Sequence, residues 1–353
     1  MLKRKTWLEK RNLKIQKRNR KRKRKKKYNR VVGCELKNAK GEIGAKVNEE
    51  LKEVSLQVPK NFSLENNPEE TIEFFSKLRS YEKTGKSKIK FFIDSSEIVT
   101  LTVDALMYLI AVIVDLTNNP QNRYKFLGNF PKSEKIKKLY INSGFMSYVK
   151  SKENYSKESN CDKIQIKTGA ENEPDIAKYA CEYTQEKCKL GMIETRPLYN
   201  ILIEMMGNTK QHAYEEKMTD RAKYWYLFAE EADKYVKFVF LDTGLGIPAT
   251  VKKKLIKEKI LGFVIEDSQY IKSALNGENR TQTNKPNRGK GLPQISECFK
   301  QGLLSDVYIA SGKGSCLLSE TEKTFKTKEY SGEMLGTLFS WKIKKGQRIN
   351  DKD

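Results

Sequence analysis

The segment from Leu198 to Tyr214, LYNILIEMMGNTKQHAY, restricts the possible folds of this chain more than any other. It predicts an amphipathic helix, because its apolar residues recur at the spacing of one helix face. Glu204, Asn208 and His212 follow one another at intervals of four residues. Since each residue turns a helix by about 100°, these three side chains spread over only about 80° of its surface. A carboxylate, an amide oxygen and an imidazole placed together can position a water molecule and a hard cation.

Taken alone, this spacing also fits an ordinary helix with polar residues at its solvent border, and His212 is the only histidine in the chain. The order of the segments that follow favours a functional site. An apolar strand over 238–247, FVFLDTGLGI, runs directly into a D-x-G-x-G turn. A second glycine turn over 287–292, NRGKGL, opens a helix, and a last strand, GTLFSWKI, begins at Gly336.

The order of these four segments resembles the N, G1, G2 and G3 boxes of the GHKL ATPases. That superfamily includes gyrase, histidine kinases, the large heat-shock chaperone and the mismatch-repair ATPase. The resemblance covers about residues 165 to 345. It implies a Bergerat fold, an α/β sandwich in which ATP lies between the helices and one face of a mixed sheet. It also implies Mg2+ as a cofactor beside ATP.

The resemblance implies an adenine pocket around the first glycine turn. Asp242 would accept a hydrogen bond from the adenine amino group, and an unpaired acceptor would penalise the wrong base. Gly244 and Gly246 would allow a tight turn and a close approach of the backbone to the base. Thr337 would lie at the base of the pocket and hold a water molecule beside Asp242, and Ile247 would complete the box. The same residues also fit an ordinary strand-to-turn sequence.

The resemblance also implies a phosphate and metal site. Asn208 would bind Mg2+ through its side-chain oxygen, with ATP phosphates supplying most other ligands. Glu204 would act as the general base on the attacking water, and His212 would contact phosphate or support that base. The alternative for His212 is a helix-border histidine with satisfied hydrogen bonds. The second glycine turn would present backbone N–H groups and two basic side chains to the phosphates. Its residues are Arg288, Gly289, Lys290, Gly291 and Leu292, and residues 248–287 would form a lid.

Residues 50–150 predict a separate small α/β layer in which strands alternate with helices. The run FFIDSSEIVTLTVDALMYLIAVIVDL, followed by SEKIKKLYINSGFMSYV, resembles a STAS domain, the fold of anti-sigma-factor antagonists. Signalling members carry a phosphorylatable serine at the start of the helix, whereas Thr102 to Ala105 here contain none. We therefore expect a docking or packing module. The expected helices cover 68–81, 102–116, 134–142 and 173–189, and the expected strands cover 89–94, 124–127 and 164–167.

The positive charge is concentrated in residues 1–49, which predict a basic tail. The first 30 residues hold 17 Lys or Arg and one acid, Glu9, and therefore contribute +16 of the formal charge of +24. Such a run predicts salt-dependent contact with RNA or DNA through phosphate neutralisation. A solvated tail that binds polyanions without specificity is the alternative. A polar stretch over 151–163 predicts a linker to a GHKL domain over 164–353.

The remaining composition predicts a cytoplasmic protein that does not contact a membrane. The six cysteines form no C-x-x-C pair, which fits reduced thiols rather than zinc ligands. The N-terminal residues lack the apolar region of a secretory signal, so we do not expect one. The longest apolar run, Ala105 to Val114, is too short to span a bilayer and predicts a buried helix.

These features favour an Mg2+-dependent ATP-binding protein that acts as a slow ATPase or an ATP-gated switch. A macromolecular partner and an ATP-dependent homodimer would fit the superfamily, and the STAS-like layer would offer a protein-docking surface. One alternative is a protein serine kinase of the anti-sigma-factor type. Another is a scaffold that senses nucleotide without hydrolysing it and binds nucleic acid. A histidine kinase fits less well, because no dimerisation helix pair with a phosphoacceptor is apparent.

Overall fold

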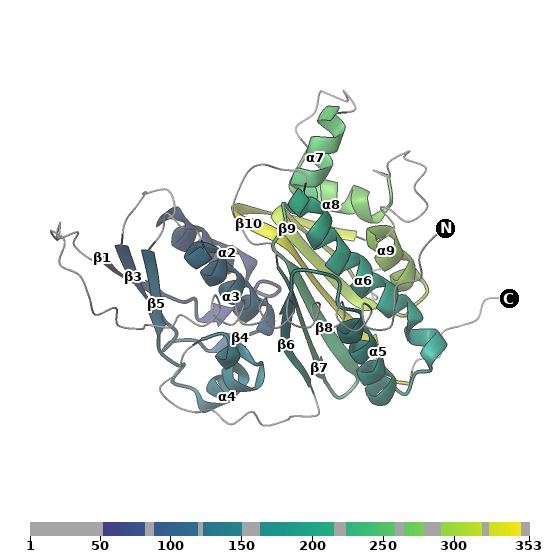
Figure 1. The fold of residues 1–353 in the computed structure, drawn as a ribbon, viewed down its shortest axis with the longest axis horizontal. Helices are drawn as coiled ribbons and strands as arrows, with labels where there is room; N and C mark the ends of the chain where they lie inside the picture. Colours follow the sequence, from purple (N-terminus) through teal and green to yellow (C-terminus); the bar gives the residue numbers. More distant parts are fainter. Residues whose placement is uncertain are drawn as a thin grey trace, which may run out of the picture. The chain divides into compact units, whose positions relative to one another are not determined.

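The computed structural model describes residues 52–81, 88–118, 123–149, 163–214, 224–257, 265–278, 291–319 and 325–346. It is an α/β protein, as the sequence predicts, and contains both parallel and antiparallel sheets (Figure 1). The described residues of Glu50–Phe145 and Ser156–Asp353 pack as one compact unit. A second unit comprises Met1–Glu49 and Met146–Tyr155, of which residues 146–149 are described. The predicted basic tail and all but the last residue of the predicted linker lie outside the described residues.

The first layer of the compact unit is built on a three-stranded parallel sheet in the order β1-β3-β5. The structure confirms the helices and strands predicted here, with shifts of one or two residues at their ends. A two-stranded sheet pairs β2 with β4. The elements are β1 (Lys52–Gln57), β2 (Asn61–Phe62), α2 (Pro68–Ser80), β3 (Lys88–Asp94), β4 (Thr100–Leu101), α3 (Val103–Asn118), β5 (Arg123–Gly128), α4 (Glu134–Asn142) and the 3-10 helix η2 (Phe145–Ser147).

The second layer is built on a five-stranded sheet in the order β6-β7-β8-β10-β9. We expected a mixed sheet, and this expectation is wrong, because every pairing in the sheet is antiparallel. Short connections join β7 to β8 and β9 to β10, and such hairpins impose antiparallel pairing. The elements are β6 (Lys163–Gly169), α5 (Pro174–Cys188), α6 (Met192–Tyr214), β7 (Trp225–Glu231), β8 (Tyr235–Asp242), α7 (Ile247–Lys257), α8 (Asp267–Leu275), α9 (Gly291–Lys300), β9 (Ser305–Leu318) and β10 (Phe325–Lys344).

Two of these elements begin well before the residue that the sequence predicts. Helix α6 begins at Met192 rather than Leu198 and contains Pro197. A proline here cannot bond the carbonyl of Ile193, and that residue is 87% exposed, so water can satisfy the carbonyl. Strand β10 begins at Phe325 rather than Gly336, because its first half pairs with the long strand β9. Among the helices that the structure describes, none has the length and hydropathy needed to cross a membrane.

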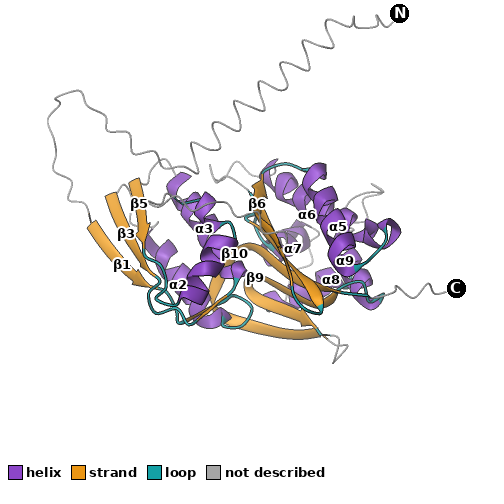
Figure 2. Ribbon diagram, turned by 90° about the horizontal axis from the view of Figure 1, so that it is seen from below, coloured by secondary structure: helices purple, strands orange, loops and turns teal. Residues whose placement is uncertain are grey.

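Helices cover both faces of the five-stranded sheet. Alternate side chains of β8, including Phe238 and Phe240, pack into one hydrophobic core with α5, α6, α8 and α9. The opposite face meets α2 and α3 of the first layer, which lie between the two sheets in Figure 2. There the Tyr308 hydroxyl donates to the carbonyl of Leu64 at 3.0 Å. The predicted separate layer is therefore packed against the second sheet through a buried interface.

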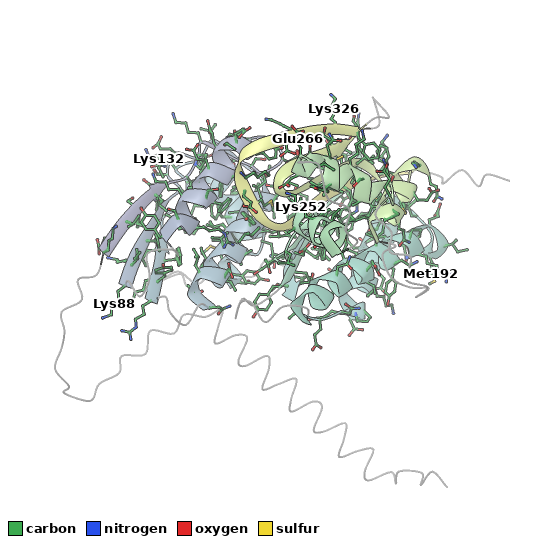
Figure 3. The ribbon with its side chains drawn as sticks, turned by 90° about the horizontal axis from the view of Figure 1, so that it is seen from above. Lys88, Lys132, Met192, Lys252, Glu266 and Lys326 are labelled. Carbon is green, nitrogen blue, oxygen red and sulfur yellow. The ribbon has the colours of Figure 1, made fainter. Side chains whose placement is uncertain are left out.

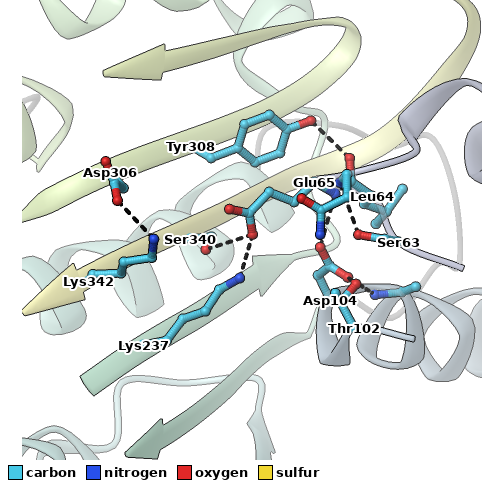
Figure 4. A network of polar contacts seen from close by, with 12 residues as sticks. Ser63, Leu64, Glu65, Thr102, Asp104, Lys237, Asp306, Tyr308, Ser340 and Lys342 are labelled. Carbon is cyan, nitrogen blue, oxygen red and sulfur yellow. Dashed lines mark hydrogen bonds and ion pairs between the residues drawn. The ribbon is translucent and has the colours of Figure 1, made fainter. Parts of the chain in front are cut away.

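A buried polar cluster also crosses this interface (Figure 4). The Nζ atom of Lys237 on β8 lies 2.5 Å from the carboxylate of Glu65. The Asp104 carboxylate accepts the backbone N–H groups of Glu65 at 3.1 Å and Ala105 at 2.6 Å, together with the hydroxyl of Thr102. Burial raises the pKa of Asp104. Burial alone would lower the pKa of Lys237, but the charges of Glu65 and Asp104 outweigh it and raise that pKa.

Candidate functional site

Helix α6 presents the polar border that its sequence predicts. Its buried residues, among them Leu202 and Met205, pack into the core, whereas Glu204 and Asn208 are half-buried. Consecutive positions four apart place Glu204 and Asn208 on one side of the helix. The helix packs against β8 and α9, so this polar border belongs to the same part of the fold as the glycine turn that follows β8. His212 lies in the last turn of α6, and its side chain lies outside the described residues.

The glycine turn after β8 is held by the side chain of Asp242, the last residue of that strand. Its Oδ1 atom accepts the backbone N–H of Gly244 at 2.8 Å. Gly246 has a φ of +84°, a conformation that favours glycine. Thr243, which follows Asp242, exchanges hydrogen bonds with the backbone of Tyr224, the residue immediately before β7. The turn is therefore fixed on both sides, and the positive φ of Gly246 explains the second glycine of the D-x-G-x-G motif.

The hydroxyl of Ser311 on β9 joins this turn to the third glycine segment. Its Oγ atom donates to the carbonyl of Gly336 at 2.7 Å and accepts the N–H of Ile247 at 3.0 Å. It also lies 3.3 Å from the hydroxyl oxygen of Thr337. Ser311 is fully buried, so these contacts are shielded from water. Three segments far apart in the sequence thus meet at one buried hydroxyl.

The two glycines at this junction have no room for a side chain. A Cβ atom on Gly246 would lie 2.7 Å from the Ser311 Oγ atom, and one on Gly336 would lie 2.0 Å from the carbonyl oxygen of Asp242. Both distances are shorter than real Cβ contacts. Gly336 also has a φ of +82°. Gly246 therefore approaches the side chain of Ser311, and Gly336 the backbone of Asp242, more closely than any other residue type would allow. This close packing explains why glycine occupies both positions.

The structure brings part of the predicted site together. Thr337 pairs in register with Asp242 across β10 and β8, and its side chain is buried. Gly244, Gly246 and Ile247 surround the same turn. Gly291 and Leu292 begin helix α9, which packs against α6. The predicted phosphate-binding residues before that helix lie outside the described residues, namely Arg288, Gly289 and Lys290.

Much of the predicted lid that the structure describes is anchored. Helix α8 packs on β9 and buries Ile271 and Leu275 in the core. The carboxylate of Asp267, at its start, pairs with Lys252 at 2.7 Å and accepts the N–H of Lys313 at 2.9 Å. The polar end of the predicted lid lies mostly outside the described residues. Movement of residues 265–278 as a lid would therefore break core contacts.

Sequence reasoning missed two residues of this region. Ser311 lies in a segment rich in glycine and serine, ASGKGS, which could have indicated a close backbone approach. Asn172 lies in the loop before α5, and a Cβ on Gly207 of α6 would meet its amide oxygen at 3.5 Å. This amide thus lies beside α6 at a position between Glu204 and Asn208. No local pattern around Asn172 predicts that contact.

The region offers carboxylate, amide and hydroxyl groups but no preformed metal cluster. Among the described residues, no group of three or more His, Cys, Asp or Glu side chains could hold a metal ion. A cation bound near Asn208 would need most of its ligands from a bound anion or water. Such sparse protein ligation is typical of Mg2+ bound together with a phosphorylated ligand.

Comparisons with known proteins give little independent information about this region. No protein-family model matches the chain, and no solved structure matches it. The chain is similar to the SAGA complex subunit SPT8 of Saccharomyces cerevisiae, with 27% identity over 149 residues. The match covers 38% of this chain and 24% of the yeast protein, so the chain spans about a quarter of that relative's length. Such partial similarity assigns no family.

Proposed function

We propose that residues 164–353 form a GHKL-type domain that binds ATP with Mg2+ and acts as a slow ATPase or an ATP-gated switch. The observation that carries the proposal is the junction of Asp242, Gly246, Ser311 and Thr337. It places a carboxylate acceptor, a buried hydroxyl pair and a glycine turn within one strand-end cluster. A macromolecular partner, bound through the basic tail or the STAS-like layer, would respond to the nucleotide.

The junction fits an adenine base. The Asp242 carboxylate can accept the exocyclic amino group of adenine, which a guanine would not offer at that position. Gly244 lets a planar base approach, because a Cβ there would lie 2.8 Å from the Asp242 Oδ1 atom. The Thr337 hydroxyl would provide a donor and an acceptor at the inner end, where the Ser311 hydroxyl, already bonded to Gly336 and Ile247, would hold it in place. Each group therefore has a role in recognising the edge of the base.

Helix α6 fits the phosphate end of the proposed site. Asn208 would bind Mg2+ through its amide oxygen, and the ion, when bound, would neutralise charge on the phosphates. Glu204, one turn earlier, would accept a proton from the attacking water. The start of α9 at Gly291 would direct backbone N–H groups at the phosphate oxygens. Both helices meet in the core, which keeps these groups on rigid elements.

ATP turnover by the full chain tests the proposal. Free phosphate and protein-bound phosphate should be followed together, with and without Mg2+. We expect slow, Mg2+-dependent release of free phosphate, loss of release in Glu204→Ala with ATP binding retained, and loss of ATP binding in Asp242→Asn. Asp306→Asn is the matched control, because Asp306 lies on the same sheet in an ion pair at the rim.

The outcomes separate the candidate activities. Label on the protein instead of in solution would show a protein kinase. ATP binding without either product would show a nucleotide sensor. Normal turnover in both Glu204→Ala and Asp242→Asn would contradict the site itself.

A further inference from the structure

The residues that the structure describes leave one face of the three-stranded parallel sheet open. Side chains of β3 alternate strictly, so that Ile89, Phe91 and Ile93 are buried beneath the helices of the first layer. The alternate residue Phe92 is 38% exposed, and Leu127 on β5 is 51% exposed. Parallel sheets are nearly always covered on both faces. An open parallel face with apolar side chains therefore indicates a surface that a partner covers.

Strand register arranges this open face in rows. Lys88 pairs with Arg123, Lys90 pairs with Lys125, and Phe92 pairs with Leu127 across β3 and β5. Residues two apart on a strand lie about 6.6 Å from each other, so two basic rows precede one apolar row at that spacing. Figure 3 shows Lys88 at the end of the sheet where β3 begins. We call these six residues the open face.

Two of the four cations of the open face, both on β5, are available to a ligand. Arg123 and Lys125 are exposed, and neither forms an ion pair with another residue that the structure describes. Lys90 is partly neutralised by Glu53 on β1, at 2.5 Å. The Phe92 ring has no aromatic partner within the described chain. The face therefore combines solvated cations with an accessible aromatic ring.

We propose that the open face binds single-stranded nucleic acid, with phosphates on the basic rows and a base on Phe92 and Leu127. Positive rows beside an exposed aromatic ring complement a chain of anionic phosphates that carries flat, apolar bases. A protein partner would use the apolar pair but would have to desolvate the basic rows. A duplex would hide its bases and could engage only the basic rows. The proposal does not depend on nucleotide binding at Asp242.

The test uses the full chain and a fluorescein-labelled oligouridylate of about 12 nucleotides, a length within the site sizes of single-strand binders. Anisotropy titrations over a salt series would compare wild type with Phe92→Ser and Lys125→Ala. Phe92→Ser should lower affinity about fivefold or more at every salt concentration, because stacking releases no counterions. Lys125→Ala should reduce the slope of log affinity against log salt by about 0.7.

Matched controls separate the open face from the basic tail. Ile193→Ser removes another exposed apolar side chain, and Lys300→Ala removes another exposed charge, so both should leave affinity unchanged. Cross-linking with 4-thiouridine in the oligonucleotide should label the peptide that contains Phe92. Cross-links confined to residues 1–30, with unchanged affinity in Phe92→Ser, would overturn the proposal. Light scattering would show whether wild type forms a dimer that Phe92→Ser does not form. Such a loss, with unchanged nucleic-acid affinity, would overturn the proposal and indicate that a second copy of the chain covers the open face.

Discussion

The two larger sheets of this protein differ in how their faces are covered. The five-stranded sheet is antiparallel, a type that can leave one face to water, yet helices cover both of its faces. The three-stranded sheet is parallel, a type that is usually covered on both faces, yet it exposes Phe92 and Leu127. The direction of the strands therefore does not decide coverage here. The pattern of side chains along each strand does.

The contrast is visible within single strands. On β8, Phe238, Val239, Phe240 and Leu241 follow one another and are all buried, so both faces of that strand are apolar. On β3, basic residues alternate with apolar ones until Phe92. Covering β8 on both sides is favourable, because apolar area is buried on either face. Covering β3 on both sides would remove its lysines from water. The free-energy cost of this desolvation keeps one face open unless a bound polyanion offsets it.

We expect the greatest change in stability from one of two neighbouring residues of β3, which lie on opposite faces of the sheet. Phe91→Ala should lower the free energy of unfolding by about 3–5 kcal/mol, because Phe91 is fully buried and its loss leaves a cavity. Phe92→Ala should change it by no more than about 1 kcal/mol, because that ring already contacts water. Urea unfolding followed by circular dichroism measures both. Equal losses would show that the open face is covered in solution.

A second pair of variants compares buried and peripheral charges at the interface between the layers. Asp104→Ala should destabilise the protein by about 3 kcal/mol, because it leaves the backbone N–H groups of Glu65 and Ala105 without their acceptor and removes a negative charge near Lys237. Asp306→Asn removes an ion pair with Lys342, at 2.8 Å, in which the side chains of Lys342 and Asp306 are 25% and 39% exposed. Asparagine tolerates the φ of +45° at this position, so the change adds no backbone strain. Its cost should stay below about 1 kcal/mol. Urea unfolding again measures the free energy of unfolding of both variants. Similar losses in the Asp104 and Asp306 variants would mean that Asp104 is hydrated.

A third pair of variants tests a single hydrogen bond at the junction, where we expect a smaller loss than for Phe91→Ala or Asp104→Ala. The N–H of Leu335, beside Gly336, donates to the buried hydroxyl of Tyr108 on α3 at 2.8 Å. Tyr108→Phe should cost about 1–2 kcal/mol, because it removes this acceptor from a partly buried N–H group. Tyr179→Phe is the control, since Tyr179 is 47% exposed. Amide hydrogen exchange at Leu335 should accelerate only in Tyr108→Phe, and an unchanged rate would show that the bond is not formed in solution.

The sequence predicts individual elements better than their assembly. Helical spacing identifies α6, and the apolar run before Asp242 identifies β8, because both signals are local. The glycine turns point to close backbone approaches, which Gly246 and Gly336 indeed make. Strand pairing and the burial of α2 and α3 against a distant sheet depend on contacts between residues far apart in the chain. Ser311 shows the limit, because its three partners come from segments that no local pattern connects.

The bond between Tyr308 and Leu64 has a consequence for how the chain folds during synthesis. Its partners are 244 residues apart in the sequence, and Ser340 and Glu65, which also bond, are 275 apart. At about 5–20 residues per second, the ribosome needs roughly 10–50 s to add the missing strands. During that interval the surfaces of α2 and α3 that will meet the second sheet have no partner. A chaperone that binds exposed apolar helices would have its best opportunity then, and slow codons after residue 145 would lengthen it.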